Sequence, residues 1–181
     1  FVSKLNSNLT TLLASTYIGG SESDDLFGIT FDNSANVFVT GRTQSSNYPT
    51  TAGAYDDTFN GGTTVDADGI IDILDDGIIS KLNNNLDSLL SSTFIGGSNE
   101  DEAFAMTADA SGDVFVVGVT ASPEFPTTAW PAYDKTLNGA GDLFILHMTN
   151  NLKSCIFCPS PEQKIQWQNF ADKVHQFEEF I

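Results

Sequence analysis

TYIGGSESDDLFGITFDNSANVFVTGRTQSSNYPTTA, residues 16–52, decides the fold, because the same pattern returns later in the chain. Residues 93–129, TFIGGSNEDEAFAMTADASGDVFVVGVTASPEFPTTA, align with it without gaps and are identical at 20 of 37 positions. The match continues backwards through KLNSNL (4–9) and KLNNNL (81–86). Self-similarity of this kind is the signature of a repeat architecture. The sequence is therefore built around two copies of one unit.

Each copy has the pattern of short strands. VFVTG (37–41) and VFVVG (114–118) are β-branched and aromatic runs bounded by turn residues, and each follows another short strand pattern across a turn. We expect about four strands per copy, and no helical periodicity occurs in residues 1–154. The residues predicted to lie in buried or half-buried strands are Val37, Phe38, Val39, Val114, Phe115 and Val116.

The combined string T-[YF]-I-G-G-S, V-F-V-x-G-x-T and [YF]-P-T-T resembles the bacterial β-propeller repeat called SBBP. The resemblance covers residue 1 to about residue 154, and it carries no shared catalytic residues. It implies an all-β, β-propeller-type fold in a secreted or cell-surface bacterial protein. We expect two four-stranded antiparallel blades plus the first strand of a third. No signal-peptide pattern occurs in the chain.

Spacing between the copies defines the expected domains. Equivalent lysines, Lys4 and Lys81, are 77 residues apart, whereas the KLNNNL pattern returns as HMTNNL after only 66 residues. The difference is an Asp-rich insertion. The predicted units are repeat 1 (1–77, with the insertion at about 63–75), repeat 2 (78–142), the first strand of a third repeat (143–154) and a tail (155–181).

Two blades are fewer than a closed propeller needs. Repeat units bury their faces against neighbours, so an isolated pair exposes apolar faces and strand edges. The expected partners are further blades, either from a longer chain of which this is a fragment or from other copies. A protein or glycan ligand is not identified by the sequence.

The net charge of the chain is −17, with 24 acidic and 7 basic side chains. The scattered Lys and Arg form no basic stripe, which disfavours binding to nucleic acid or anionic membranes. No apolar run approaches the roughly 18 residues of a membrane-spanning helix, so we expect no membrane insertion.

The insertion TVDADGIIDILD has the spacing of a calcium-binding loop that begins at Thr64. Alternate carboxylates, a glycine at position 6 and a backbone carbonyl at position 7 converge on one Ca²⁺ ion in such loops. Thr stands where Asp is usual, and Asp replaces the closing Glu. A solvated acidic loop without calcium is the alternative. The predicted calcium ligands are Thr64, Asp66, Asp68, Ile70, Asp72 and Asp75.

A second acidic run follows each Gly-Gly pair, at residues 22–25 and 100–102. Because it recurs at equivalent positions, we expect its carboxylates to cap turns, with cation binding between blades as the alternative.

Catalysis has little support in this sequence. There is no G-x-S-x-G motif. His147 aligns with Lys81, at a position that we expect to face solvent. We therefore predict a non-enzymatic binding or structural scaffold. The alternative is a carbohydrate-active or other hydrolytic propeller that uses carboxylates.

The tail changes in character. Ser160 and Pro161 are typical of a helix start, and an aromatic stripe predicts an amphipathic helix that docks on its own domain or on a partner. Cys155 and Cys158 precede this helix, and a local disulfide between them is expected in an exported protein, with free thiols as the alternative.

Overall fold

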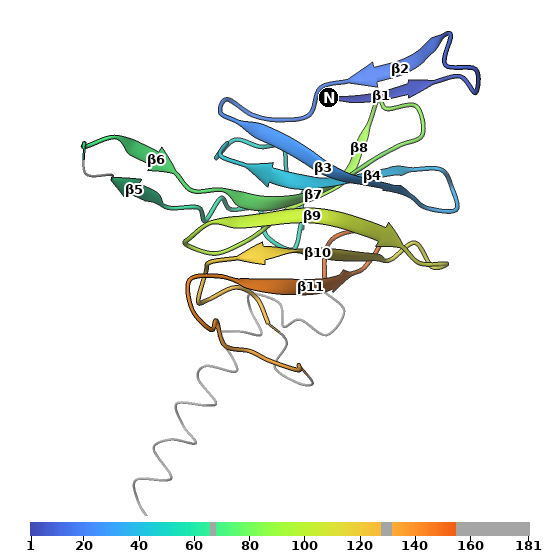
Figure 1. Ribbon diagram of the computed structural model, residues 1–181. Coiled ribbons are helices and arrows are strands. Elements are labelled where there is room, and N and C mark those ends of the chain that lie inside the picture. The colour runs from blue at the N-terminus through green and yellow to red at the C-terminus, as the bar shows by residue number, and fades with distance from the viewer. Residues whose placement is uncertain (66–67, 128–131, 155–181) are drawn as a thin grey trace, which may run out of the picture.

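The computed structural model describes residues 1–65, 68–127 and 132–154. Every regular element in these ranges is a β-strand, and the strands form antiparallel sheets, as Figure 1 shows. The predicted all-β class is therefore confirmed. The expected C-terminal helix, Cys155 and Cys158 lie outside the described residues. The described part of the chain has no helix with the length and apolarity needed to cross a membrane.

A four-stranded sheet forms the centre of the structure. Its strands lie in the order β3 (Asp24–Phe31), β4 (Val37–Thr43), β7 (Asp76–Leu82) and β8 (Leu89–Ile95). Each strand is antiparallel to the next. Between β4 and β7 the chain makes a separate hairpin, β5 (Thr63–Val65) and β6 (Ile71–Ile73), which projects to one side in Figure 1.

A three-stranded sheet follows, in the order β9 (Asp101–Ala108), β10 (Val114–Thr120) and β11 (Asp142–Met148). Before the four-stranded sheet, β1 (Val2–Leu5) and β2 (Leu12–Thr16) pair only with each other among the described strands. Runs of β-branched and aromatic residues explain the strands, because such side chains fit a pleated, half-buried surface.

The grouping of strands differs from the predicted pair of four-stranded blades. One sheet has four strands and the next has three, and the four-stranded sheet combines β3 and β4 of the first sequence copy with β7 and β8 of the second. The boundary drawn between residues 77 and 78 therefore falls inside β7. A repeat in sequence gives the length of the unit but not the place where a hydrogen-bonded sheet begins.

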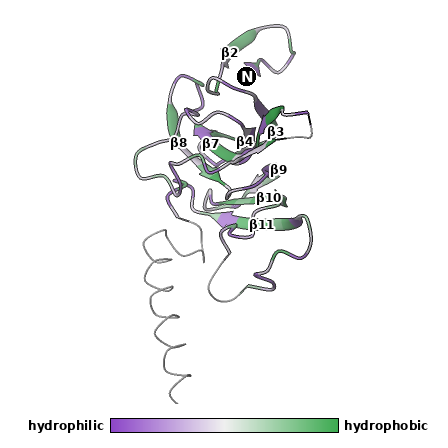
Figure 2. Ribbon diagram, turned by 90° about the vertical axis from the view of Figure 1, so that its left-hand side faces the viewer, coloured by the Kyte–Doolittle hydropathy of each residue, from purple (hydrophilic) through white to green (hydrophobic). Residues whose placement is uncertain are grey.

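The sheets pack as successive layers, as seen in Figure 2. Strand β9 lies against β3, β4 and β7. The main core fills the space between the two larger sheets, and its fully buried members include Phe38, Ile79, Val114, Val116 and Met148. A second core joins β1–β2 to the four-stranded sheet through Val2, Val37, Val39, Leu82 and Leu86.

The hairpin turns before β4 and β10 follow one design. Asp32 Oδ1 accepts the N–H groups of Ser34 and Asn36, and Asp109 Oδ1 accepts those of Ser111 and Asp113. Each turn needs one residue with positive φ, which is Ala35 (59°) in the first and Gly112 (84°) in the second. Only the second turn has the residue that adopts this conformation without steric cost.

Candidate functional site

One face of the three-stranded sheet is apolar and uncovered. Phe115 and Val117 of β10 are 39% and 41% exposed, and Leu143 and Ile145 of β11 are 83% and 80% exposed. We call these four residues the outer face. Phe115 was expected to be buried or half-buried, and it is more exposed because no described element packs over the outer face. Isolated apolar side chains on a surface are ordinary, but a contiguous group of four indicates an interaction surface.

The four-stranded sheet has an equivalent face, and another sheet covers that face. The sequence repeat makes Phe38 equivalent to Phe115 and Ile79 equivalent to Ile145. Phe38 and Ile79 are both fully buried, because the three-stranded sheet packs over them. The same surface is therefore buried in one sheet and open in the next.

On the opposite side of the stack, three leucines occupy equivalent turns. Leu86 and Leu152 occupy equivalent turns with φ near 59° and 53°, and both are buried against the preceding layer. Leu9 has the same conformation in the turn after β1 but is 75% exposed. The stack is thus open at both ends, at the leucine turn of β1–β2 and at the outer face.

An open groove of about 660 Å³ runs along β11. Its lining includes Phe125, Tyr133, Leu137 and Phe144. In the four-stranded sheet the corresponding edge of β7 is paired with β8, whose backbone also bonds the preceding loop. Among the described residues no strand occupies this position beside β11. The groove therefore lies where a fourth strand of this sheet would pair with β11.

A buried ion pair lies at one end of the covered face. Lys81 Nζ is 3.0 Å from Asp32 Oδ2 and 4.8 Å from the centre of the Phe38 ring. Burial opposes ionisation of Asp32, but hydrogen bonds from Asn36, Lys81 and backbone N–H groups outweigh it and lower its pKa to about 2. Lys81 is only 7% exposed, so the expectation that this position faces solvent was wrong. The neighbouring sheet covers it, and its charge is paired.

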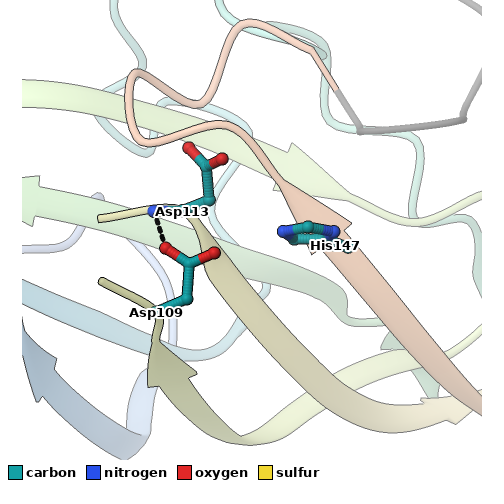
Figure 3. A group of neighbouring side chains, drawn as sticks. All are labelled: Asp109, Asp113 and His147. Atoms are coloured by element: carbon teal, nitrogen blue, oxygen red, sulfur yellow. Dashed lines mark hydrogen bonds between the residues drawn. The ribbon is translucent and has the colours of Figure 1, made fainter. Parts of the chain in front are cut away.

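The equivalent end of the outer face holds Asp109, Asp113 and His147 (Figure 3). One potential ligand atom from each residue lies within 4.8 Å of the other two. The His147 ring stacks on Phe115 with centroids 4.0 Å apart, and its Nε2 is buried without a hydrogen-bond partner. Hydrogen bonds from Ser111 are the leading cause of a lowered pKa at Asp109, so this carboxyl is ionised at neutral pH.

A second carboxylate cluster surrounds Arg42. This guanidinium binds Asp25 and Asp75, each at 3.1 Å, and also Glu102 of the next sheet. Burial raises the pKa of Asp75, and repulsion from Glu100, Glu102 and Asp25 adds to that effect, so that the attraction of Arg42 is outweighed. The cluster joins two sheets electrostatically, and its cation is supplied by the chain itself.

Asp76 is a carboxyl whose pKa is strongly shifted by burial. It is fully buried, and burial raises its pKa to about 7 despite hydrogen bonds from the N–H groups of Asn60 and Gly61. Repulsion from Asp101 contributes in the same direction. Both carboxylates crowd Gly96, where a Cβ would meet Asp76 Oδ1 at 2.3 Å and Asp101 Oδ2 at 2.9 Å.

One acidic residue after each Gly-Gly pair caps the turn as predicted, whereas Asp25 and Glu102 of the same runs bind Arg42 instead. Asp24 Oδ2 accepts the N–H of Gly20 at 2.8 Å, and Asp101 Oδ2 accepts the N–H of Gly97 at 2.7 Å. Hydroxyl groups from the loops after β4 and β10 complete both caps.

The predicted calcium ligands are distributed over the β5–β6 hairpin and its exit. Thr64 and Asp72 are cross-strand partners, and the side chain of Asp72 is exposed. Asp75 is buried, and its carboxylate faces Arg42. Asp68 and Ile70 lie in the connecting turn, and Asp66 lies outside the described residues.

Comparison with known families supports the architecture. Residues 15–49 match the family model of a β-propeller repeat, SBBP. The expected resemblance to SBBP is confirmed for this segment. The matched SBBP segment includes β3 and β4 and ends just after them. Its internal copy continues the SBBP pattern through β9 and β10. No curated protein matches the chain in a sequence comparison.

Two features of these layers were missed by reasoning from sequence. The Asp32–Lys81 pair joins residues from different sequence copies, and the Asp109–Asp113–His147 group joins the end of one hairpin to a strand more than 30 residues later. A signal for the second group was present. Where the four-stranded sheet has Asn36 and Lys81, the three-stranded sheet has Asp113 and His147.

Proposed function

We propose that this chain is a non-enzymatic segment of a β-propeller that acts as a structural and binding scaffold. The observation that carries the proposal is the contrast between equivalent residues, because Ile79 is fully buried by the next sheet whereas Ile145 is 80% exposed. The SBBP repeat supports the assignment to propeller blades.

The proposed occupant of the outer face is another sheet of the same repeat, from a longer chain or from a second copy. It would present a surface like that of Val114, Val116 and Met148, which already covers Phe38 and Ile79. The proposed occupant of the groove is a strand like β8. The described structure contains one example of each contact: one sheet packed over the equivalent face, and one strand, β8, paired at the equivalent edge.

Self-association of the purified chain tests this proposal, because each molecule has both open ends. We expect concentration-dependent association in sedimentation velocity experiments. Ile145→Glu on the outer face and Leu9→Glu at the other end should each weaken it at least tenfold. The matched control is Ile71→Glu, since Ile71 is 65% exposed but lies on the β5–β6 hairpin. A chain that stays monomeric, or one in which Ile145→Glu and Ile71→Glu behave alike, contradicts the proposal.

We further propose that the scaffold is extracellular or at the cell surface, and that calcium stabilises the insertion. Asp66, Asp68 and Asp72 lie within seven residues of sequence, and a bound cation would relieve their repulsion; Asp75 contacts Arg42 and would have to leave it to become a ligand. With Thr64 in the first ligand position, we expect a Kd on the order of 10⁻⁴ M, which suits extracellular calcium.

Calorimetric titration distinguishes this calcium site from a solvated acidic loop. At tenfold excess over Kd, calcium should stabilise the folded chain by about 1.4 kcal/mol. The Asp66→Asn, Asp68→Asn double variant should lose both the heat and the stabilisation. Absence of a heat or a thermal shift in the wild-type chain at millimolar calcium would remove calcium from the proposal.

A hydrolytic propeller is the alternative function. It would need a carboxylic acid that is protonated near neutral pH, and Asp76 has that property. Asp76 is fully buried, however, and does not line the groove along β11. Screening on glycan and ester libraries separates the two functions. Turnover that a single Asp→Asn change abolishes would support the enzyme and defeat the scaffold.

A further inference from the structure

We propose that Asp109, Asp113 and His147 bind a divalent transition-metal ion, with Zn²⁺ as the expected class. This site lies at the edge of the outer face and is separate from the proposed calcium loop. It does not depend on what covers the outer face.

The first step of the argument is that the equivalent place in the four-stranded sheet holds a cation. Lys81 brings its ammonium group to 3.0 Å from Asp32 Oδ2 and places it over the Phe38 ring. Asn36 donates a hydrogen bond from Nδ2 to the same carboxylate oxygen. This fold therefore has a preformed position for positive charge, between the carboxylate of the turn and the aromatic ring.

The second sheet keeps the carboxylate and the ring but replaces the cation. Asp109 corresponds to Asp32 and Phe115 to Phe38, whereas His147 stands at the lysine position and Asp113 at the asparagine position. One permanent positive charge is lost and one carboxylate is gained. The position thus becomes more negative while the surrounding geometry is retained.

In the described part of the chain, Asp109 and His147 each have a ligand atom without a hydrogen bond, whereas Asp113 accepts the N–H of Asn150 with Oδ1 at 2.8 Å and a longer bond from the Ser111 hydroxyl with Oδ2 at 3.3 Å. Each Asp113 oxygen keeps a second lone pair for an ion. Asp109 uses Oδ1 for the turn, and the structure shows no hydrogen bond to its Oδ2 from the described residues. This second oxygen corresponds to the one that Lys81 contacts in the first sheet. His147 Nε2 is buried and has no partner, and Figure 3 shows a nitrogen of the ring on the side of the two carboxylates. A buried ring nitrogen without a partner is costly unless something binds it.

The donor set selects the type of ion. An imidazole nitrogen with two carboxylate oxygens suits Zn²⁺ and its first-row neighbours, whereas Ca²⁺ and Mg²⁺ prefer oxygen alone. The ligand atoms of the three residues lie within 4.8 Å of one another. Tetrahedral ligands about 2.0–2.2 Å from a common zinc ion lie about 3.3–3.6 Å from one another, so any pair of ligand atoms near the 4.8 Å limit would move together by about 1 Å when the ion binds. Three protein ligands leave at least one position on the ion for water or for a donor from another molecule.

The test is a calorimetric titration of the full chain with ZnCl₂, with CoCl₂ titrated in parallel by visible absorption. The decisive variant is Asp113→Asn with His147→Lys, which restores the residues of the first sheet. Because Asn36 and Lys81 are compatible with the same backbone, this variant should fold, and far-UV circular dichroism checks that it does. A second variant, His147→Gln, removes the imidazole without adding a charge.

We expect one zinc ion to bind the wild-type chain, and both variants to bind it at least tenfold more weakly. Glu100→Gln is the matched control, because Glu100 belongs to the acidic cluster around Arg42, and it should bind zinc as the wild type does. Three results would overturn the proposal: no binding at millimolar zinc, binding that both variants retain, or a cobalt spectrum dominated by a thiolate charge-transfer band. The last would place the ion at Cys155 and Cys158 instead.

Discussion

Replacing Asp76 by asparagine should stabilise the folded chain at alkaline pH and have little effect in acid. Asp76 is fully buried and its pKa is raised from 3.8 to about 7, chiefly by desolvation. In the unfolded chain the same carboxyl ionises near its ordinary pKa. The folded state therefore holds a proton between about pH 4 and pH 7 that the unfolded state has released.

The sign of the effect follows from proton linkage. Where the folded state binds more protons, the free energy of unfolding falls as pH rises, so the wild-type chain loses stability from about pH 4 to pH 7. The full difference in pKa corresponds to about 4 kcal/mol, taken as an order of magnitude. The asparagine side chain of the Asp76→Asn variant cannot ionise, keeps an oxygen for the N–H of Asn60, and places an amide donor near Asp101. We expect a gain of roughly 2–4 kcal/mol at pH 8.

Urea unfolding of wild type and variant at half-unit steps from pH 4 to pH 9 measures this directly. Asp142→Asn is the matched control, because Asp142 begins β11 as Asp76 begins β7 and accepts the N–H of Asn138 at 2.6 Å. It removes the same formal charge at a less buried position. The reasoning is refuted if Asp76→Asn is no more stable than wild type at pH 8, or if its advantage does not change with pH.

Three further predictions concern the covered face and the turns. Phe38→Ala should destabilise the chain by about 3–5 kcal/mol, whereas Phe115→Ala on the uncovered face should cost about 1 kcal/mol, as measured by chemical unfolding; equal costs would mean that both rings are buried. Lys81→Met should cost about 1–3 kcal/mol at pH 7, because it leaves the Asp32 carboxylate with only neutral hydrogen-bond donors, and the cost should shrink below pH 4 as that carboxylate is protonated. Ala35→Gly should stabilise by about 0.5–1 kcal/mol and Gly112→Ala should destabilise by a similar amount, since both positions have positive φ; opposite signs in thermal unfolding would contradict the turn assignment.

Much of the fold could be predicted from sequence because its information is local. Runs such as VFVTG specify strands, and the near-identity of residues 16–52 and 93–129 specifies that the same hairpin occurs twice. The assignment of strands to sheets could not be obtained this way. A periodic sequence has no preferred starting point, so β7 and β8 could be assigned to their own copy or to the sheet of β3 and β4.

The candidate sites were less accessible to sequence reasoning, because they depend on contacts between distant residues. A lysine in a repeat suggests a solvated position, and only the structure shows that Lys81 is covered by the next sheet and neutralised by Asp32. Asp75 fits the spacing of a calcium ligand, yet its carboxylate contacts Arg42, which lies on a different strand. Spacing along the chain identifies which atoms can converge, but not which competing partner is closer.

The contact between the two larger sheets joins two different surfaces: the face that includes Val114 and Met148 packs on the face that includes Phe38 and Ile79. Such an interface is heterologous and directional, because neither surface is complementary to itself. Adding a layer leaves the same pair of unlike surfaces at the two ends, so growth does not terminate by forming a symmetric dimer. Assembly ends when the rotation between layers returns the last surface to the first, and otherwise yields an open array. Two molecules of this chain that meet through these surfaces should therefore associate head to tail. The surface around Leu9 of one molecule then stays exposed until a ring closes.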